Sequence, residues 1–364
     1  MSEFNFKSDS RSVHTAPRRA FLSACGALAA AVAAHGAARA AAPVSAAPGP
    51  IPLPPTVSPG WPRMFADLAA FPKPALPSPD DVEAWDALRQ RLAAMFEEMS
   101  RERVSATGVR SRKGTLGGVP VIWLEPPHVR RRDCLIVYAH GGAYTLGTAS
   151  STLLAPAQMA LATGFCVVSI DYTTAPRAKW ERTTDDVGKV FAALYADGYA
   201  PRRIGCFGDS AGGGLLAGAL LRMRDSKIPL PAAAALWSPW SDLDFQGDTL
   251  LTLAAADPIV STETLRPSRD AYVGAGERRN PYASPVYGNY SKNYPPTLVQ
   301  CGLREVLLSD SVRLYQAMAA GGVAVTLDAY EGMPHVHQTM ADTSPEAQRA
   351  IAKTVAFLIG HVES

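Results

Sequence analysis

The sequence predicts an α/β fold with a mostly parallel central sheet and helices on both of its faces. Segments with helical periodicity, such as residues 184–196, alternate with short runs of apolar residues. Strands that are apolar on both faces are typical of a parallel sheet covered by helices on both sides, and reactive residues then gather at the carboxyl ends of the strands. The apolar runs lie at 135–139, 165–170, 204–207, 232–237, 297–300 and 323–329.

A Gly-x-Ser-x-Gly motif follows the third of these strands. Residues 208–213 read GDSAGG, and a helix-like segment begins directly after them. In a sharp turn between strand and helix, small residues at Gly208 and Gly212 allow a close approach that presents the hydroxyl of Ser210. Ser210 is therefore the candidate nucleophile, and the N–H group of Ala211 at the positive helix end is a candidate oxyanion donor. The alternative is an ordinary tight loop without chemistry.

A second glycine-rich turn follows the first strand, as His140-Gly141-Gly142. Backbone N–H groups of Gly141 and Gly142 can point inward without obstruction by side chains, which suits an oxyanion hole. The alternative is a simple glycine turn. His140 is expected to brace this loop and not to act as a base.

Three motifs in this order resemble the hormone-sensitive-lipase family of α/β-hydrolases: HGGA at 140–143, DYTTAP at 171–176 and GDSAGG at 208–213. The resemblance extends from about residue 114 to the carboxyl terminus. It implies an α/β-hydrolase fold, a serine esterase without metal or cofactor, and a helical cap formed by about 63–105 and 245–289. The family usually has Arg-Leu where this chain has Thr173-Thr174, and Glu where it has Arg177.

The nucleophile requires a histidine base and a carboxylate that orients it. His335 follows the 323–329 strand and resembles the family's Gly-Met-x-His, whereas His337 is the alternative, as base or as part of a metal pair with His335. For the acid, Glu305 follows the 297–300 strand, where the family carries its carboxylate. Asp310, on what is predicted to be the next helix, is the alternative.

The amino terminus predicts export. Residues 1–40 resemble a twin-arginine signal, with Arg18-Arg19 before an alanine-rich stretch and small residues at 38–40, although Pro17 departs from the usual Ser or Thr. A retained membrane anchor is the alternative, but the stretch is short and built of alanine. A Pro-rich linker at 41–62 and a hydrolase domain at 63–364 follow, and we expect a periplasmic or secreted protein with no stable membrane anchor.

The predicted function is a serine carboxylesterase that hydrolyses small to medium acyl esters through an acyl-enzyme. An amidase or lactone hydrolase with the same triad is the near alternative, and a ligand-binding protein that has lost its chemistry is the distant one. A net charge of +2 lacks the strong excess of basic residues that is typical of nucleic-acid-binding proteins. The oligomeric state is left open by the sequence.

Three further features concern the fold. A helix is predicted over 79–104 with Asp80 and Asp81 near its start, and a hairpin over 109–113 and 119–124. The cysteines that would remain after signal cleavage lie in or beside apolar strands without the spacing of metal or redox sites, so we expect buried free thiols. They are Cys134, Cys166, Cys206 and Cys301.

Overall fold

The computed structural model describes residues 52–71, 73–340 and 342–364. The predicted signal at 1–40 and most of the predicted linker therefore lie outside the described residues. Of the described residues, 52–69, 75–340 and 342–364 belong to one compact unit, and 70, 71, 73 and 74 belong to the other. All of the contacts discussed below lie within the larger unit.

An eight-stranded sheet has the order β1-β2-β4-β3-β5-β6-β7-β8. The first two strands form the predicted antiparallel hairpin, and β2 pairs antiparallel with β4. All neighbours from β4 to β8 are parallel, which confirms the predicted fold class. The strands are β1 Arg110–Leu116, β2 Val119–Glu125, β3 Leu135–Ala139, β4 Cys166–Ile170, β5 Ile204–Asp209, β6 Ala233–Trp237, β7 Thr297–Gly302 and β8 Val325–Tyr330.

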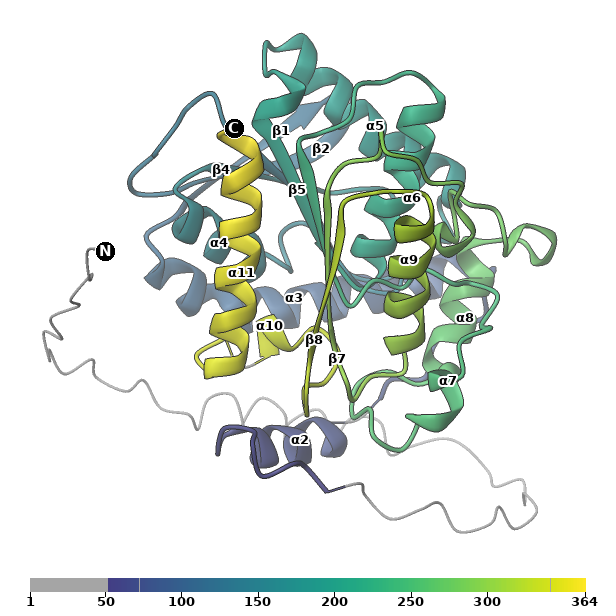
Figure 1. Cartoon of the computed structure of the whole chain (residues 1–364). Helices are drawn as coiled ribbons and strands as arrows, with labels where there is room; N and C mark the ends of the chain where they lie inside the picture. The colour runs from purple at the N-terminus through teal and green to yellow at the C-terminus, as the bar shows by residue number, and fades with distance from the viewer. Residues whose placement is uncertain (1–51, 72, 341) are drawn as a thin grey trace, which may run out of the picture. The chain divides into compact units, whose positions relative to one another are not determined.

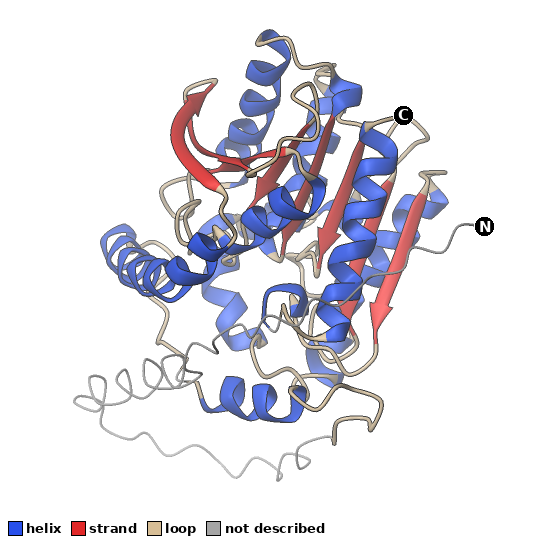
Figure 2. Cartoon of the chain, turned by 90° about the vertical axis from the view of Figure 1, so that its left-hand side faces the viewer, coloured by secondary structure: helices blue, strands red, loops and turns tan. Residues whose placement is uncertain are grey.

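Helices cover both faces of this sheet, so the central strands are buried on both sides (Figures 1 and 2). Every residue of β3 and β6 is buried, because the two faces belong to two separate apolar cores. One core contains side chains of α5, α6 and α9, and the other contains side chains of α4 and α11. These helices are α4 Leu154–Thr163, α5 Trp180–Ala196, α6 Ala211–Asp225, α9 Leu308–Ala320 and α11 Pro345–Val362.

Helices also occupy the two segments expected to form a cap. The first contains α3, Val82–Ala106, which begins three residues later than the predicted 79–104. Asp81 caps it as predicted, because its side chain accepts the N–H of Ala84 at 3.0 Å. On its buried side α3 packs Trp85 and Leu88. The second segment contains α7 Thr249–Thr252, α8 Thr262–Tyr272 and the short 3-10 turns Ala275–Glu277 and Pro285–Tyr287.

The packed part of the chain begins before the linker boundary predicted at residue 62. Trp61 is 1% exposed and starts helix α2, Trp61–Ala70. Its indole Nε1 donates to Glu346 at 3.1 Å, and the backbone N–H of Ser58 donates to the same carboxylate at 2.9 Å. Proline-rich composition predicted an extended tether, but burial of Trp61 against Met333 fixes this part of the chain on the hydrolase body.

Among the described residues, no helix combines the length and the hydropathy that crossing a membrane requires. The four cysteines named above are free thiols, three of them buried and Cys166 partly so, as the sequence predicted.

Candidate active site

Ser210 lies in the turn between β5 and α6, and its backbone φ is 54°. A serine in this left-handed region is strained, and such strain persists only where surrounding contacts hold it. Two hydrogen bonds do so: the N–H of Ser210 donates to the Trp237 carbonyl at 2.8 Å, and the N–H of Trp240 donates to the Ser210 carbonyl at 3.0 Å. Thus the end of β6 and the loop after it hold the turn that carries the serine.

The two motif glycines are required by close packing. A Cβ at Gly212 would lie 2.1 Å from the Ala139 carbonyl oxygen, and one at Gly208 would lie 2.7 Å from the backbone of Gly212. Any side chain at either position would push helix α6 away from the sheet. The sequence-based explanation of the motif as a close strand-helix turn is therefore confirmed.

The HGG turn follows β3 and meets the same turn. His140 is buried, and its Nδ1 donates to the Gly141 carbonyl at 2.7 Å while its ring stacks on Tyr172 at 4.2 Å. Burial lowers the pKa of His140, so the ring is favoured in its neutral form. Tyr172 also donates its hydroxyl to the His140 carbonyl at 2.7 Å. As expected, His140 braces the loop.

The three predicted oxyanion donors differ in their surroundings. Ala211 is the first residue of α6, so its N–H has no partner within the helix. In the described part of the chain no acceptor takes the N–H of Gly142, whose φ is 113°. The N–H of Gly141, in contrast, donates to the Asp209 carboxylate at 3.2 Å, and that carboxylate also accepts the Tyr138 hydroxyl at 2.6 Å.

His335 and Glu305 form a buried pair. The Nδ1 atom of His335 lies 2.9 Å from Oε2 of Glu305, and the side chains are 6% and 0% exposed. Since a carboxylate accepts the Nδ1 proton, the ring keeps its lone pair on Nε2. Burial by itself lowers the pKa of His335, but the hydrogen bond and the charges of Glu305, Asp257 and Asp209 raise it above its usual value. Burial raises the pKa of Glu305.

Ser210 follows β5 and His335 follows β8, and the strands from β5 to β8 are parallel neighbours, so both residues lie at the same edge of the sheet. The charge of Asp209, the residue next to Ser210, also contributes to raising the pKa of His335. The backbone near the imidazole is also strained. Val336 has a φ of 49°, which is an outlier for a β-branched residue, and Ser238 has a φ of 47°.

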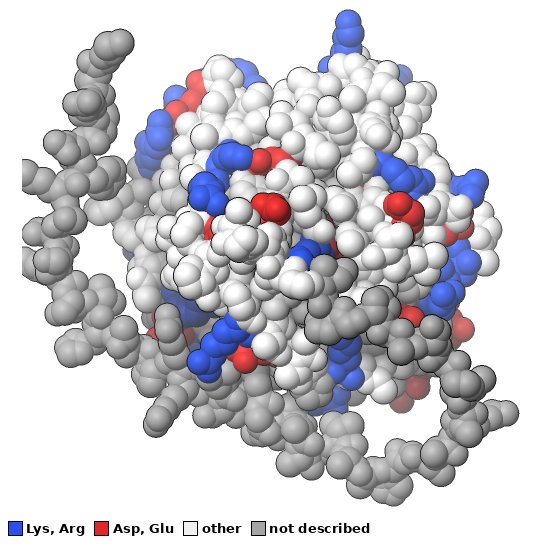
Figure 3. Space-filling model, turned by 60° about the horizontal axis from the view of Figure 1, so that its bottom comes forward, with Lys and Arg blue, Asp and Glu red and all other residues white. Residues whose placement is uncertain are grey.

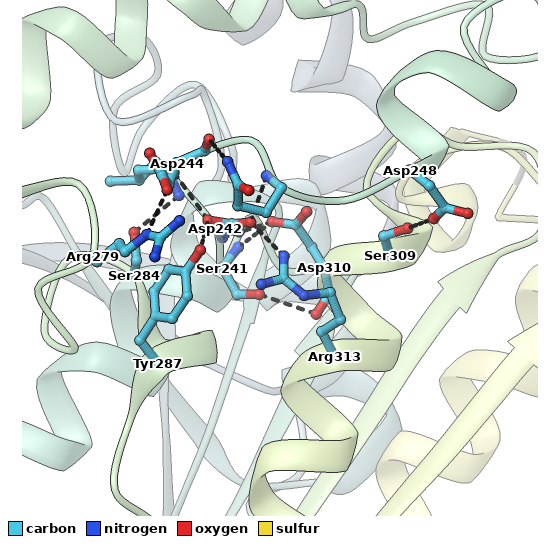
Figure 4. A network of polar contacts seen from close by, with 12 residues as sticks. Ser241, Asp242, Asp244, Asp248, Arg279, Ser284, Tyr287, Ser309, Asp310 and Arg313 are labelled. Carbon is cyan, nitrogen blue, oxygen red and sulfur yellow. Dashed lines mark hydrogen bonds and ion pairs between the residues drawn. The ribbon is translucent and has the colours of Figure 1, made fainter.

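The alternative base and acid lie elsewhere. His337 is fully buried, its ring nitrogens have no hydrogen-bond partner among the described residues, and burial lowers its pKa to about 3. Asp310 accepts the N–H groups of Ser241 and Asp242 at 2.8 and 2.7 Å and so organises the loop after β6 (Figure 4). The structure therefore pairs His335 with Glu305 and not with Asp310.

Sequence reasoning missed two residues that hold this pair. Ser238, buried directly after β6, accepts the Val336 N–H on its hydroxyl at 3.0 Å. Burial raises the pKa of Glu305, and the hydroxyl of Ser238 offsets part of this rise. Ser238 could have been predicted as a site residue, because it follows the carboxyl end of a strand. Asp257 accepts the Val306 N–H at 2.8 Å, and no local pattern connects these two residues.

Two of the three residues that differ from the family pattern, Thr174 and Arg177, contact helix α3, whereas the Thr173 hydroxyl donates to Asp186 of α5 at 2.9 Å. Arg177 forms an ion pair with Asp86, and Arg89 donates to the Thr174 hydroxyl at 2.6 Å. Burial raises the pKa of Asp86, but the hydrogen bond from Arg177 and the charges of the two arginines outweigh it, and the pKa is lowered. Thr174 and Arg177, in the loop after β4, thus each have a charged partner on α3.

In the described ranges, no group of three or more His, Cys, Asp or Glu side chains could hold a metal ion, so acidic side chains do not complete the alternative pair of His335 and His337.

Fold and site together define an α/β-hydrolase with a serine, a histidine and a carboxylate. Residues 136–339 match the family described as alpha/beta hydrolase fold. An acetyl-hydrolase of Streptomyces hygroscopicus is 34% identical over 244 residues, which cover 67% of this chain and 81% of the relative. An esterase of Acinetobacter venetianus is 31% identical over 224 residues, 61% of this chain and 74% of the relative.

Solved structures of esterases are also similar to this chain. An esterase from the bacterial hormone-sensitive lipase family has a TM-score of 0.74 at 32% identity, covering 84% of this chain and 99% of the other. The esterase E25 has a TM-score of 0.78 at 27% identity, covering 88% and 99%. The chain belongs to the hormone-sensitive-lipase family of α/β-hydrolases, as the three sequence motifs predicted.

Proposed function

We propose that this protein is a serine carboxylesterase that hydrolyses small to medium acyl esters, with Ser210 as nucleophile, His335 as base and Glu305 as the acid that orients it. The observation that carries the proposal is the buried His335–Glu305 pair at the same sheet edge as a strained serine turn. Esterases and an acetyl-hydrolase among the relatives support the substrate class.

The reaction begins when Ser210 Oγ attacks the ester carbonyl while His335 Nε2 takes its proton. The imidazolium, stabilised by Glu305, then gives this proton to the departing alcohol and leaves an acyl group on Ser210. Water attacks the acyl-enzyme, His335 takes its proton, and the proton returns to Ser210 as the carboxylic acid leaves.

The oxyanion is held by the N–H groups of Gly142 and Ala211, which lack protein acceptors among the described residues. Gly141 is a third donor only when its N–H turns from the Asp209 carboxylate. On the face drawn in Figure 3, acidic and basic side chains are interspersed and most of the visible surface carries neither. A net charge of +2 provides no field that would steer a polyanion, which fits an uncharged ester as substrate.

A substrate panel tests the proposal. Wild type and Ser210→Ala are assayed on matched chromogenic acetyl, butyryl and octanoyl esters, an aryl amide and a lactone. We expect ester turnover in the wild type and none above background in Ser210→Ala. Faster turnover of the amide or the lactone than of every ester would reassign the reaction. Lack of turnover on all of these substrates would favour a ligand-binding role.

We also propose that the protein is exported to the periplasm or beyond by a twin-arginine signal. Arg18-Arg19 and the alanine-rich stretch support this location.

A further inference from the structure

Asp257 is a buried carboxylate without a cationic partner. It lies between α7 and α8 in the second cap segment and is 6% exposed. One of its oxygens accepts the N–H groups of Ile259 and Val260 at 2.8 and 2.9 Å. The other accepts the N–H of Val306, 49 residues away, at 2.8 Å. In the part of the chain that the structure describes, no Lys or Arg forms an ion pair with it.

The local turn alone does not account for this residue. A buried unpaired charge is unfavourable, and an uncharged side chain could accept the two N–H groups of the turn without that penalty. What a carboxylate adds is a second acceptor oxygen for Val306 and a negative charge. Val306 directly follows Glu305, so Asp257 fixes the backbone that carries the acid.

The charge of Asp257 also acts on the imidazole. Among the described residues, the carboxylates whose charges act on His335 are Glu305 after β7, Asp209 at the end of β5 and Asp257 from the cap segment. The titratable group beside it along the chain is His337, the first residue of α10, His337–Met340. The three carboxylates raise the pKa of His335, whereas His337 is held neutral by burial. An imidazolium forms in the reaction, so a second nearby carboxylate stabilises the charge that develops there.

We propose that Asp257 is a positioning residue for the His335–Glu305 pair, holding the loop of the acid through Val306 and supplying a second negative charge near the imidazole. The second cap segment thereby becomes part of the machinery that sets the strength of the base. This inference rests on the proposed function, because it concerns the base of that reaction.

The test compares pH profiles of Asp257→Asn, Asp257→Glu and wild type on 4-nitrophenyl butyrate. Asp257→Asn replaces one acceptor oxygen by an NH₂ group, so the side chain cannot serve both the turn and the Val306 N–H. It also removes the negative charge. We expect its turnover to fall about tenfold and the acid limb of its kcat/KM profile to move to lower pH by roughly half a unit to one unit. Asp257→Glu keeps the charge, so its turnover should fall while its acid limb stays near that of wild type.

Asp242→Asn is the matched control. Like Asp257, Asp242 is a buried carboxylate that accepts backbone N–H groups, here from Asp244 and Gln246, but it has a charged partner in Arg313 (Figure 4). We expect this variant to lose stability without moving the acid limb. Labelling of Ser210 with a fluorophosphonate counts the folded sites, so that each turnover number refers to folded protein.

An acid limb of Asp257→Asn that superposes on wild type, or moves as much as that of Asp242→Asn, would overturn the proposal. If Asp257→Asn does not fold, Asp257→Ser, which keeps one acceptor for the turn, must show the same shift. The proposed function fails separately, through an inactive wild type or an active Ser210→Ala.

Discussion

The imidazole of His335 and the carboxylate of Glu305 meet at 2.9 Å although 30 positions separate them in the chain. The relationship arises because β7 and β8 are parallel neighbours, so the loops that follow them leave the same edge of the sheet. Both side chains are buried there, and loss of either partner would leave the other without its main polar contact.

Replacing Glu305 by Gln should lower turnover by about 10³ to 10⁴, because an amide neither stabilises the imidazolium nor enforces the tautomer with its lone pair on Nε2. Turnover on an aryl ester, with circular dichroism as a check on folding, measures this. Asp310→Asn is the control, and it should cost far less. Burial and the charge of Asp242 raise the pKa of Asp310 well above its usual value, so a neutral amide is a mild change there. The reverse ranking would transfer the role of the acid to Asp310.

Activity should fall as the pH drops through the pKa of His335, because only the neutral ring can accept the proton of Ser210. Since that pKa is raised, the midpoint of the acid limb of kcat/KM should lie above about 6.5. The same shift affects stability, because the folded protein binds this proton more tightly than the unfolded chain does. Protonation of His335 therefore adds to the free energy of unfolding below about pH 6.5, and this addition is lost as the pH rises through the pKa of the folded state. A midpoint below about pH 6.5 would contradict the assignment of His335 as the base.

Ser238→Ala should reduce both stability and turnover. It leaves the Val336 N–H without its acceptor, which costs about 1–3 kcal/mol of unfolding free energy. Displacement of the neighbouring His335 should lower kcat by about tenfold to a hundredfold. Ser241→Ala is the control, since its hydroxyl donates to the Asp310 carbonyl at 3.1 Å on the same loop. Equal turnover losses in the two variants would show that Ser238 has no special role.

Trp61→Ala should lower the free energy of unfolding by about 3–5 kcal/mol in urea denaturation, since the indole is 1% exposed and packs on Met333. Phe96→Ala provides the comparison, because Phe96 is 44% exposed and its loss should change stability little. Similar losses of unfolding free energy in the two variants would mean that burial of Trp61, in the segment before α3, does not stabilise the protein.

Replacement of Arg18 and Arg19 by Lys should leave the precursor in the cytoplasm, as fractionation with an antibody would reveal. Unchanged export of that variant would remove the twin-arginine assignment.

Strands and the main site residues were predictable because their signals are local. β3 and β6 are buried on both faces, so they appear as unbroken apolar runs, and Glu305 and His335 follow strand ends. The bond from Val306 to Asp257 was not predictable, because it depends on how a cap segment folds over a distant loop. Trp61 was assigned to the linker, since nothing near it in the sequence indicates that Glu346 will accept its indole N–H.

The hydrogen bond from Ser58 to Glu346 joins residues that are 288 positions apart. During synthesis this contact cannot form until nearly the whole chain has emerged, because Glu346 lies at the start of the last helix, α11. The contacts of the segment around Ser58 with α11 are therefore among the last that the chain can make during synthesis. The proposed export signal lies upstream of this segment, so packing of the segment on α11 and recognition of the signal concern neighbouring parts of the chain.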